Sequence, residues 1–311
     1  MGSVVTIGSS LVDIFVHSDE FHLQPSNEGL LLCQKYGEKI EVSNFTLRTG
    51  GGGSNTAVGF TRLGQEVQCV TELGKDAWAD TIVRDFQVEH VSIDHVIFEK
   101  KEQTGGSVIL VGADGGRTVL VHRGAASLLD PADIPMEPLL KADWIHLSSI
   151  SGQKDTLDHI FAIRKQSGLE GMSWNPGKRE LDLLAKGDVR VSDLPVQVLI
   201  LNRQEWDMVT QVQKSLLEQV PEIIITDGDA GGQFIVRGER KQFSIERVES
   251  LDDTGAGDAF ATGYVAGRLA GELPETAIRW ATVNSRSVVQ HIGAKPGLLT
   301  KSALEQAIVL V

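Results

Sequence analysis

Short apolar runs rich in Val and Ile alternate along this chain with segments of helical period. Strands that are apolar throughout are typical of a parallel sheet with helices on both faces, because both faces of each strand are then buried. The spacing predicts an α/β fold. The predicted strands cover residues 4–7, 67–70, 144–147, 198–201 and 223–225, and the predicted helices cover 54–63, 78–90, 154–166 and 204–218.

Two stretches interrupt this alternation. Residues 12–48 contain strand-like pieces at 12–16 and 39–42 without a clear helix between them. Residues 105–123 are typical of a β-hairpin, with strands at 106–111 and 118–122 and a glycine-rich turn at 112–116. We expect a second, small β element inserted into the α/β body. A pair of edge strands on the main sheet is the alternative.

The composition limits the classes of function. The 311 residues suffice for one large α/β unit or two modest domains. A net charge of −13 disfavours nonspecific binding to nucleic acid or an anionic membrane. Cys33 and Cys69 are too few for a disulfide framework and lie in no metal-ligand spacing. No basic stretch precedes an apolar core at the start, and no apolar run could span a bilayer, so we expect a cytoplasmic protein.

The strongest functional signal is the run Asp252-Asp253-Thr254-Gly255-Ala256-Gly257-Asp258. Successive small residues let backbone N–H groups point into one concavity, and the Ala- and Gly-rich segment 259–269 has a helical period. Unpaired N–H groups at a helix N-terminus form an anion site. Asp258 would lie in the first turn, close to any bound phosphate. A glycine-rich turn with an Asp cap is the structural alternative.

This chain resembles the ribokinase-like (PfkB) carbohydrate kinase family. Residues 252–258 match its D-T-x-G-A-G-D type of motif, and the glycines at 50–53 followed by Asn55 match its Gly-Gly loop. Other segments agree in order along nearly the whole chain: the opening strand with Asp13, the G-x-D segment at 74–76, the N-x-x-E motif at 202–205, the loop at 226–231, and the late glycine at 293.

The resemblance implies a three-layer ribokinase-like fold with a mostly parallel central sheet and a small β-sheet lid. It implies one kinase domain over residues 1–311, with the lid inserted from roughly 12–48 and 98–124. It also implies ATP-dependent transfer of a phosphoryl group to a hydroxyl. Asp258 would be the general base, and the backbone of Gly255, Ala256 and Gly257 would stabilise the transferred group.

The same resemblance assigns further site residues. The substrate-side candidates are Asp13, Gly51 and Asn55. Apart from the resemblance, an anionic acceptor would need a cation near its far end, and Arg123 after the hairpin is the candidate, although a solvated or lid-pairing arginine is the favoured interpretation. The nucleotide-side candidates are Asn202, Glu205, Thr226, Gly228, Gly231 and, as a weaker assignment than an ordinary helix residue, Asn284. Glu205 would contact Mg²⁺ through water, unless it is simply a helix carboxylate. Asp252 and Thr254, with carbonyls from 288–293, would hold a monovalent cation such as K⁺, unless Asp252 is simply a turn residue.

The sequence departs from the family pattern at two places. Many ribokinases carry a Lys where this chain has Gly52, and the segment 147–150 lacks an acidic residue that some sugar kinases place there. We expect an uncharged sugar as acceptor and a homodimer that pairs through the lids. The alternatives are a nucleoside kinase of the same fold, a kinase of a ketodeoxy sugar acid or phosphosugar, and a non-enzymatic descendant. The intact Asp258 and glycine nest oppose the last of these.

Overall fold

The computed structural model describes residues 2–27, 29–99, 101–112 and 116–309. Its centre is a nine-stranded sheet in the order β15-β14-β13-β12-β11-β10-β1-β6-β7. The strands from β13 to β7 pair in parallel, and β14 and β15 continue the sheet antiparallel. Their bounds are β1 Ser3–Ile7, β6 Glu66–Leu73, β7 Val96–Phe98, β10 Trp144–Leu147, β11 Met172–Trp174, β12 Val198–Asn202, β13 Glu222–Thr226, β14 Gly232–Val236 and β15 Glu239–Phe243.

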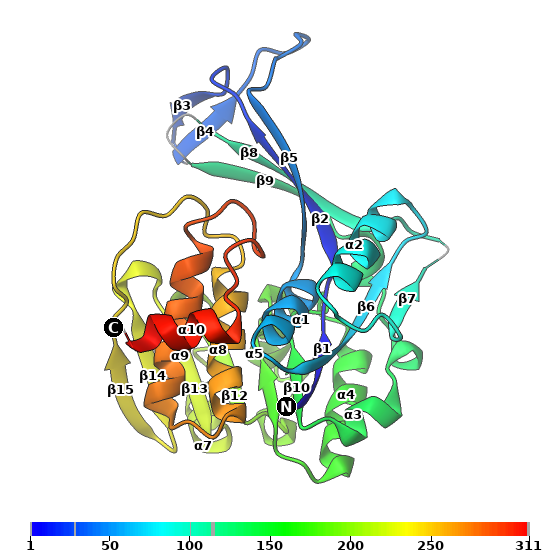
Figure 1. Ribbon diagram of the computed structural model, residues 1–311, viewed down its shortest axis with the longest axis vertical. Coiled ribbons are helices and arrows are strands. Elements are labelled where there is room, and N and C mark those ends of the chain that lie inside the picture. Colours follow the sequence, from blue (N-terminus) through cyan, green and yellow to red (C-terminus); the bar gives the residue numbers. More distant parts are fainter. Residues whose placement is uncertain (1, 28, 100, 113–115, 310–311) are drawn as a thin grey trace.

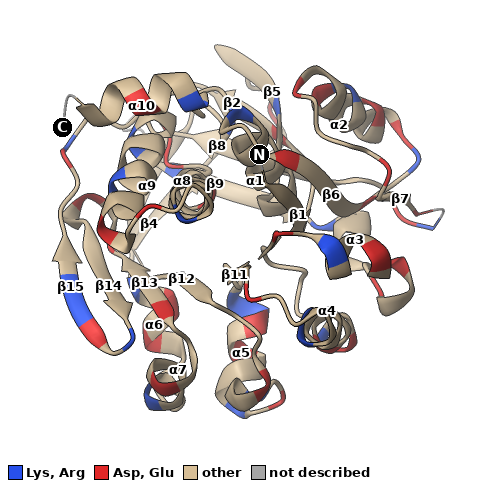
Figure 2. Cartoon of the chain, turned by 60° about the horizontal axis from the view of Figure 1, so that its bottom comes forward, with Lys and Arg blue, Asp and Glu red and all other residues tan. Residues whose placement is uncertain are grey.

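Helices cover both faces of this sheet, which gives the body three layers (Figure 2). One layer consists of α1 Gly52–Arg62, α2 Ala77–Val88, α8 Ala256–Leu269, α9 Pro274–Val288 and α10 Lys301–Val309. The other consists of α3 Met136–Lys141, α4 Lys154–Ser167, α5 Lys178–Lys186, α6 Arg203–Met208 and α7 Gln213–Gln219. Charged side chains lie on the outer helices and on the edge strand β15, whereas the central strands are largely uncharged.

The core lies on the two faces of the sheet, and β1 shows how the sequence fills it. Val4 contributes to the cluster beneath α1, α8 and α9, whereas its neighbour Val5 contributes to the cluster on the opposite face. Successive strand residues point to opposite faces. A strand buried on both sides must therefore be apolar at every position, which is the pattern that the sequence shows.

A second sheet protrudes from one end of the body as a lid (Figure 1). It contains β2 Leu11–His17, β5 Asn44–Gly50, β8 Gly105–Val111 and β9 Arg117–His122 in the order β5-β2-β8-β9. The strands β2 and β8 pair in parallel and the other pairs are antiparallel, so the lid joins two distant stretches of chain. A further hairpin, β3 His22–Ser26 and β4 Gly29–Cys33, extends from it.

Most predicted elements are confirmed, including all five core strands and both strands of the hairpin at 105–123. The central turn residues 113–115 lie outside the described part of the chain. The predicted strand at 39–42 is wrong, because the lid strand begins only at Asn44. The predicted helix at 204–218 is broken into α6 and α7 at residues 209–212, three of which (Val209, Thr210 and Val212) are β-branched and favour helices poorly. The alternative placement of the hairpin on the main sheet is also wrong.

Candidate active site

The loop at residues 251–257 leads directly into α8 and opens the first turn of that helix. Gly255 precedes the helix with a φ of 81°, and a side chain there would collide with Ala294. No side chain caps this N-terminus. The N–H of Ala256 donates to the Asp253 carbonyl at 3.2 Å, so it is committed within the loop. Gly257 is exposed and faces open space, which makes its N–H the better-placed donor for an anion.

Asp258 lies in the first turn of α8 and meets a side chain from α1. The Nδ2 of Asn55 donates to the Oδ2 of Asp258 at 2.8 Å. Burial raises the pKa of Asp258 above its ordinary value, and the hydrogen bond from Asn55 opposes this shift. A carboxylate with a raised pKa is a stronger base, while the hydrogen bond keeps it ionised. The structure thus joins the predicted base to a residue predicted on the substrate side.

One buried polar atom of this pair and one beside it have no hydrogen-bond partner among the described residues. They are Oδ1 of Asn55 and Oγ of Ser148. A Cβ at Gly52 would lie 2.8 Å from the Ser148 Cβ and 3.5 Å from Oδ1 of Asp258. Buried polar atoms are normally paired, so these two atoms are suited to a ligand that carries hydroxyl or phosphoryl groups. The crowding also explains why position 52 is a glycine.

A groove of about 580 Å³ lies on one side of the 251–257 loop. This volume is within the range of about 300–1,000 Å³ that is typical of small-molecule sites. Gly257 and Phe260 from α8 line it, together with Thr226 and Gly228 from the end of β13. The remaining lining residues include Asp229, Ile245, Glu246, Arg247, Val248, Ser250, Asp253, Ala256, Ser285, Arg286 and Val289. An uncapped helix N-terminus at the groove suits a nucleotide's phosphates.

Asn202 and Glu205 have a local structural role at the start of α6. They form a reciprocal capping box, in which Oδ1 of Asn202 accepts from the Glu205 N–H at 2.9 Å. Oε2 of Glu205 accepts from the Asn202 N–H at 2.8 Å. Burial raises the pKa of Glu205 above its ordinary value. Oε1 of Glu205 takes part in neither of these two bonds, so the cap leaves it free to contact Mg²⁺ through water.

Asn284 and Gly231, like Asn202 and Glu205, are not among the residues that line the groove. Asn284 is fully buried, and its amide donates to the Ala259 carbonyl at 2.8 Å and to Oγ1 of Thr262 at 3.2 Å. Asn284 is therefore best interpreted as an ordinary helix residue. The next two residues of α9, Ser285 and Arg286, line the groove instead. Gly231 has a φ of 86° and packs against the Phe243 carbonyl, where a side chain would collide. It shapes the turn after β13.

Asp13 lies on the inner face of the lid strand β2, close to the glycine loop. It is 7% exposed, and the hydroxyl of Ser107 on β8 donates to its carboxylate. A side chain at Gly50 would collide with Asp13. Burial raises the pKa of Asp13, while the Ser107 hydrogen bond and the nearby ammonium of Lys295 oppose that shift. Gly51 precedes α1 with a φ of 93° and packs against the Ser9 carbonyl.

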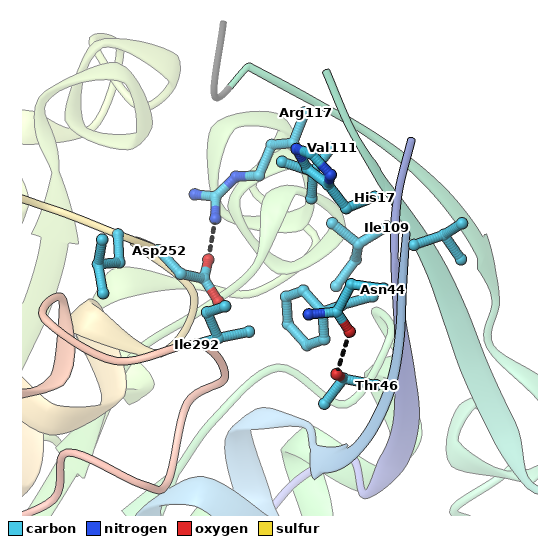
Figure 3. A pocket seen from close by; sticks show the side chains of 11 residues that line it. His17, Asn44, Thr46, Ile109, Val111, Arg117, Asp252 and Ile292 are labelled. Carbon is cyan, nitrogen blue, oxygen red and sulfur yellow. Dashed lines mark hydrogen bonds and ion pairs between the residues drawn. The ribbon is translucent and has the colours of Figure 1, made fainter. Parts of the chain in front are cut away.

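A cavity of about 130 Å³ lies against the inner face of the lid, on the other side of the 251–257 loop (Figure 3). Its walls are mainly apolar, with polar groups from the lid strands and Arg117. The lining residues are Phe15, Val16, His17, Asn44, Thr46, Ile109, Val111, Arg117, Leu251, Asp252 and Ile292. Asp252 therefore faces this cavity, whereas Asp253 faces the larger groove. The loop forms a wall between the two spaces.

Asp252 is buried and already surrounded by donors. Its Oδ1 accepts from the N–H and the hydroxyl of Thr254 at 3.0 and 2.6 Å, and its Oδ2 accepts from the Gly293 N–H at 2.8 Å. The guanidinium of Arg117, from the lid, forms an ion pair with the same carboxylate (Figure 3). The carbonyl of Val289 accepts from the N–H groups of residues 251 and 252. A guanidinium thus lies beside the predicted monovalent cation position.

Arg117 is a site residue that the sequence reasoning missed. Arg123, the arginine predicted at the acceptor, is exposed and is not among the residues that line the cavity. Arg117 is the first residue of β9, whereas Arg123 follows the end of that strand and has helical backbone angles. The register pairs Arg117 with Val111 near the tip of the hairpin, where it reaches across to Asp252. The two arginines therefore lie at opposite ends of β9, and only the one near the tip of the hairpin reaches Asp252.

Known proteins resemble this chain over most of its length. A family model described as "pfkB family carbohydrate kinase" matches residues 1–301. A deoxyribokinase of Salmonella typhi is 28% identical over 265 residues, which cover 83% of this chain and 82% of that protein.

Solved structures resemble the fold over its full length. A nucleoside kinase of Methanocaldococcus jannaschii superposes with a TM-score of 0.82 at 18% identity, covering 100% of this chain and 99% of that one. An E. coli ribokinase-like structure with ATP and Mg²⁺ superposes with a TM-score of 0.83 at 20% identity, covering 100% of both chains. No helix among the described residues is long and apolar enough to cross a membrane.

Proposed function

Because the chain belongs to the pfkB family of carbohydrate kinases, we propose that it transfers the γ-phosphoryl group of ATP to a hydroxyl of a small, uncharged sugar. The observation that carries this proposal is the contact between Asn55 and Asp258 at 2.8 Å. It places the candidate base where the acceptor-side helix α1 meets the donor-side helix α8. An acceptor hydroxyl at Asp258 and a phosphate at the α8 N-terminus would then be neighbours, as phosphoryl transfer requires.

The residues of the donor groove fit a nucleotide with Mg²⁺. Mg²⁺ neutralises charge on the phosphates and keeps several of its waters, so few direct protein ligands are needed. Among the described residues no group of three or more His, Cys, Asp or Glu could hold a metal alone. We therefore assign Glu205 to a water-mediated contact. The N–H of Gly257 would bind phosphate oxygens, and Thr226 and Gly228 would line the nucleotide.

Several features support a small and uncharged acceptor. The lid cavity of about 130 Å³ is smaller than the range of about 300–1,000 Å³ of typical ligand sites. The carboxylate of Asp13 can accept hydrogen bonds from adjacent sugar hydroxyls and would repel an anion. The guanidinium of Arg117 is already paired with Asp252. An anionic acceptor would compete with that carboxylate for the guanidinium.

A nucleoside is the second candidate acceptor, and the apolar lid cavity favours it. Phe15 lies two residues beyond Asp13 on β2, so the two side chains share one face of the lid. Together with Ile109 and Val111 it forms an apolar wall beside the site of the proposed sugar hydroxyls. A planar base attached to a sugar could rest against such a wall. The fold similarity to a nucleoside kinase is compatible with this alternative.

An ATP-coupled assay over ribose, deoxyribose, fructose, ketodeoxy sugar acids, phosphosugars and nucleosides tests the proposal. We expect turnover of a neutral sugar, with Asp13→Ala raising its KM strongly because the carboxylate binds hydroxyls. Arg123→Ala is the matched control on the same lid and should change little. If instead a phosphosugar or sugar acid were turned over and Arg123→Ala abolished that activity at unchanged ATP affinity, the neutral-sugar assignment would be wrong.

Three finer features belong to the same proposal. A potassium ion beside Asp252 and Thr254 would fix the geometry of the loop that precedes α8. A homodimer through the lids would cover exposed apolar residues of the lid strands such as Phe45 and Leu120. Sedimentation that shows a monomer at every concentration would rule out this dimer and leave the kinase assignment intact.

We place the protein in the cytoplasm because the reaction consumes ATP and both cysteines are free thiols.

A further inference from the structure

Lys295 is a buried lysine that the proposed chemistry leaves without a role. It follows α9 and is 6% exposed. Its Nζ donates to Oδ2 of Asp85 at 2.5 Å, to Oγ of Ser54 at 2.6 Å and to Oγ1 of Thr49 at 2.9 Å. The three donors of the ammonium are thus all used. The group also lies 5.5 Å from the centre of the Phe86 ring. Such full coordination indicates that this lysine holds a fixed geometry.

Two of these partners flank the glycine loop on the acceptor side. Thr49 precedes the glycines at the end of β5, and Ser54 lies in the first turn of α1. The next residue, Asn55, donates to Asp258. One ammonium therefore ties together both ends of the segment 50–53, whose glycines have few conformational restraints of their own. Asp85, on α2, anchors the same ammonium from the opposite side and also accepts from the Thr49 hydroxyl at 2.7 Å.

The residues just before Lys295 contact the donor-side loop. The Gly293 N–H donates to Oδ2 of Asp252 at 2.8 Å. Ala294 fills the space that a side chain at Gly255 would need. The segment 293–295 therefore contacts the loop that leads into α8 with its first two residues and the glycine loop with its third. This short segment therefore connects the two halves of the candidate active site through its noncovalent contacts.

The charge of Lys295 also acts on the site. It lowers the pKa of Asp13, opposing the burial that raises it. Burial lowers the pKa of Lys295 itself, and the carboxylate of Asp85 opposes that shift. Position 52 of the glycine loop cannot hold a lysine without movement, because a Cβ there would lie 2.8 Å from the Cβ of Ser148. Lys295 provides a positive charge beneath the same loop.

We infer that Lys295 is a positioning residue of this kinase, whose ammonium holds the glycine loop in register with the 252–258 loop so that Asn55 and Asp258 meet at the acceptor. The inference rests on the proposed kinase function. A purely structural role is the competing explanation, because removing one partner of a buried ion pair destabilises a fold even when the pair is remote from any site. The two explanations differ in what happens to turnover when stability is restored.

The test compares Lys295→Met with the double variant Lys295→Met/Asp85→Leu and with the control Arg164→Met. Arg164 is fully buried and donates to the carbonyls of Ala142 and Gly171, in the layer of α4 on the far side of the sheet. Its loss should lower the unfolding temperature without changing kcat. The double variant removes both charges together, which leaves no unpaired buried charge and should recover stability.

For Lys295→Met we expect kcat to fall about 10–100-fold, since misplacement by about 1 Å can have such effects, while ATP affinity measured without acceptor stays unchanged. The low kcat should persist in the double variant at recovered stability. A kcat that recovers with stability, or that equals wild type in Lys295→Met, would overturn the positioning role. The assay starts from wild-type turnover, so an inactive wild type would contradict the proposed function, whereas active variants would contradict only the role of Lys295.

Discussion

Asn55 donates a hydrogen bond of 2.8 Å to Asp258 across 203 residues of chain. The two side chains come from the first turns of α1 and α8, whose N-termini converge at the end of the sheet that carries the lid. This contact stabilises the ionised form of a carboxylate whose pKa burial raises. It links the ionisation of the proposed base to the helix that follows the glycine loop.

The first prediction is that Asn55→Leu shifts the pH dependence of turnover. The hydrogen bond lowers the pKa of Asp258, so its loss lets burial raise that pKa further. A base must be ionised to accept a proton, and the acidic limb of the kcat profile should therefore move to higher pH. The profile of kcat between pH 5 and 9 measures this. An unchanged acidic limb would show that the Asn55 hydrogen bond does not influence the ionisation of the catalytic base.

Asp258→Asn is predicted to keep the fold and nucleotide binding while lowering kcat about 10²–10⁴-fold, the usual effect of losing a general base. The substituted amide is close in size and can still contact Asn55. ATP titration followed by fluorescence or calorimetry provides the binding control, and thermal unfolding provides the folding control. Turnover within a few-fold of wild type would contradict the assignment of the base.

Potassium dependence should increase when Arg117 is replaced. The guanidinium and a monovalent cation would both be attracted to the carboxylate of Asp252, so they compete for the same charge. We expect a modest stimulation by potassium in the wild type and a several-fold larger one in Arg117→Gln. Rates in potassium and in a large organic cation at equal ionic strength measure the effect, with Arg123→Gln as the control on the same hairpin. If each of the three proteins turned over at the same rate in potassium as in the organic cation, the proposed cation site would be wrong.

The stability of the fold should decrease with pH because of Glu72, which is 3% exposed at the end of β6. Burial, with the carboxylates of Asp133, Glu99 and Asp130 nearby, raises the pKa of Glu72 from 4.5 to about 8. Above pH 4.5 the unfolded chain releases this proton, whereas the folded chain retains it up to about pH 8. The folded state binds more protons, so the free energy of unfolding falls across this window, by at most about 1.4 kcal/mol per pH unit.

Glu72→Gln removes this titrating group and should therefore weaken the dependence of the free energy of unfolding on pH. Urea unfolding at pH 5, 6.5 and 8 measures the free energy of unfolding for both proteins. We expect the free energy of unfolding of the variant to increase relative to that of the wild type as the pH rises. A constant difference between the two proteins across this range would show that Glu72 titrates normally in the folded state.

Several features could be read from local sequence. The apolar runs predict the core strands because strands buried on both faces have no polar positions, as β1 shows. The run 252–258 predicts an anion site because small residues before a helix leave N–H groups accessible, and α8 does begin inside that run. The break between α6 and α7 was missed, since the predicted period continued across residues that favour other conformations.

The pairings that would make the site work were decided by tertiary structure alone. Nothing local connects Arg117 to Asp252, or Lys295 to Thr49 and Ser54. These contacts join segments more than a hundred residues apart, which only the assembly of the lid sheet and the central sheet brings together. The sequence determined which chemical groups are present and which backbone turns they can occupy. Only the packed fold determined their partners, because burial and charge pairing act between side chains that become neighbours when the sheets form.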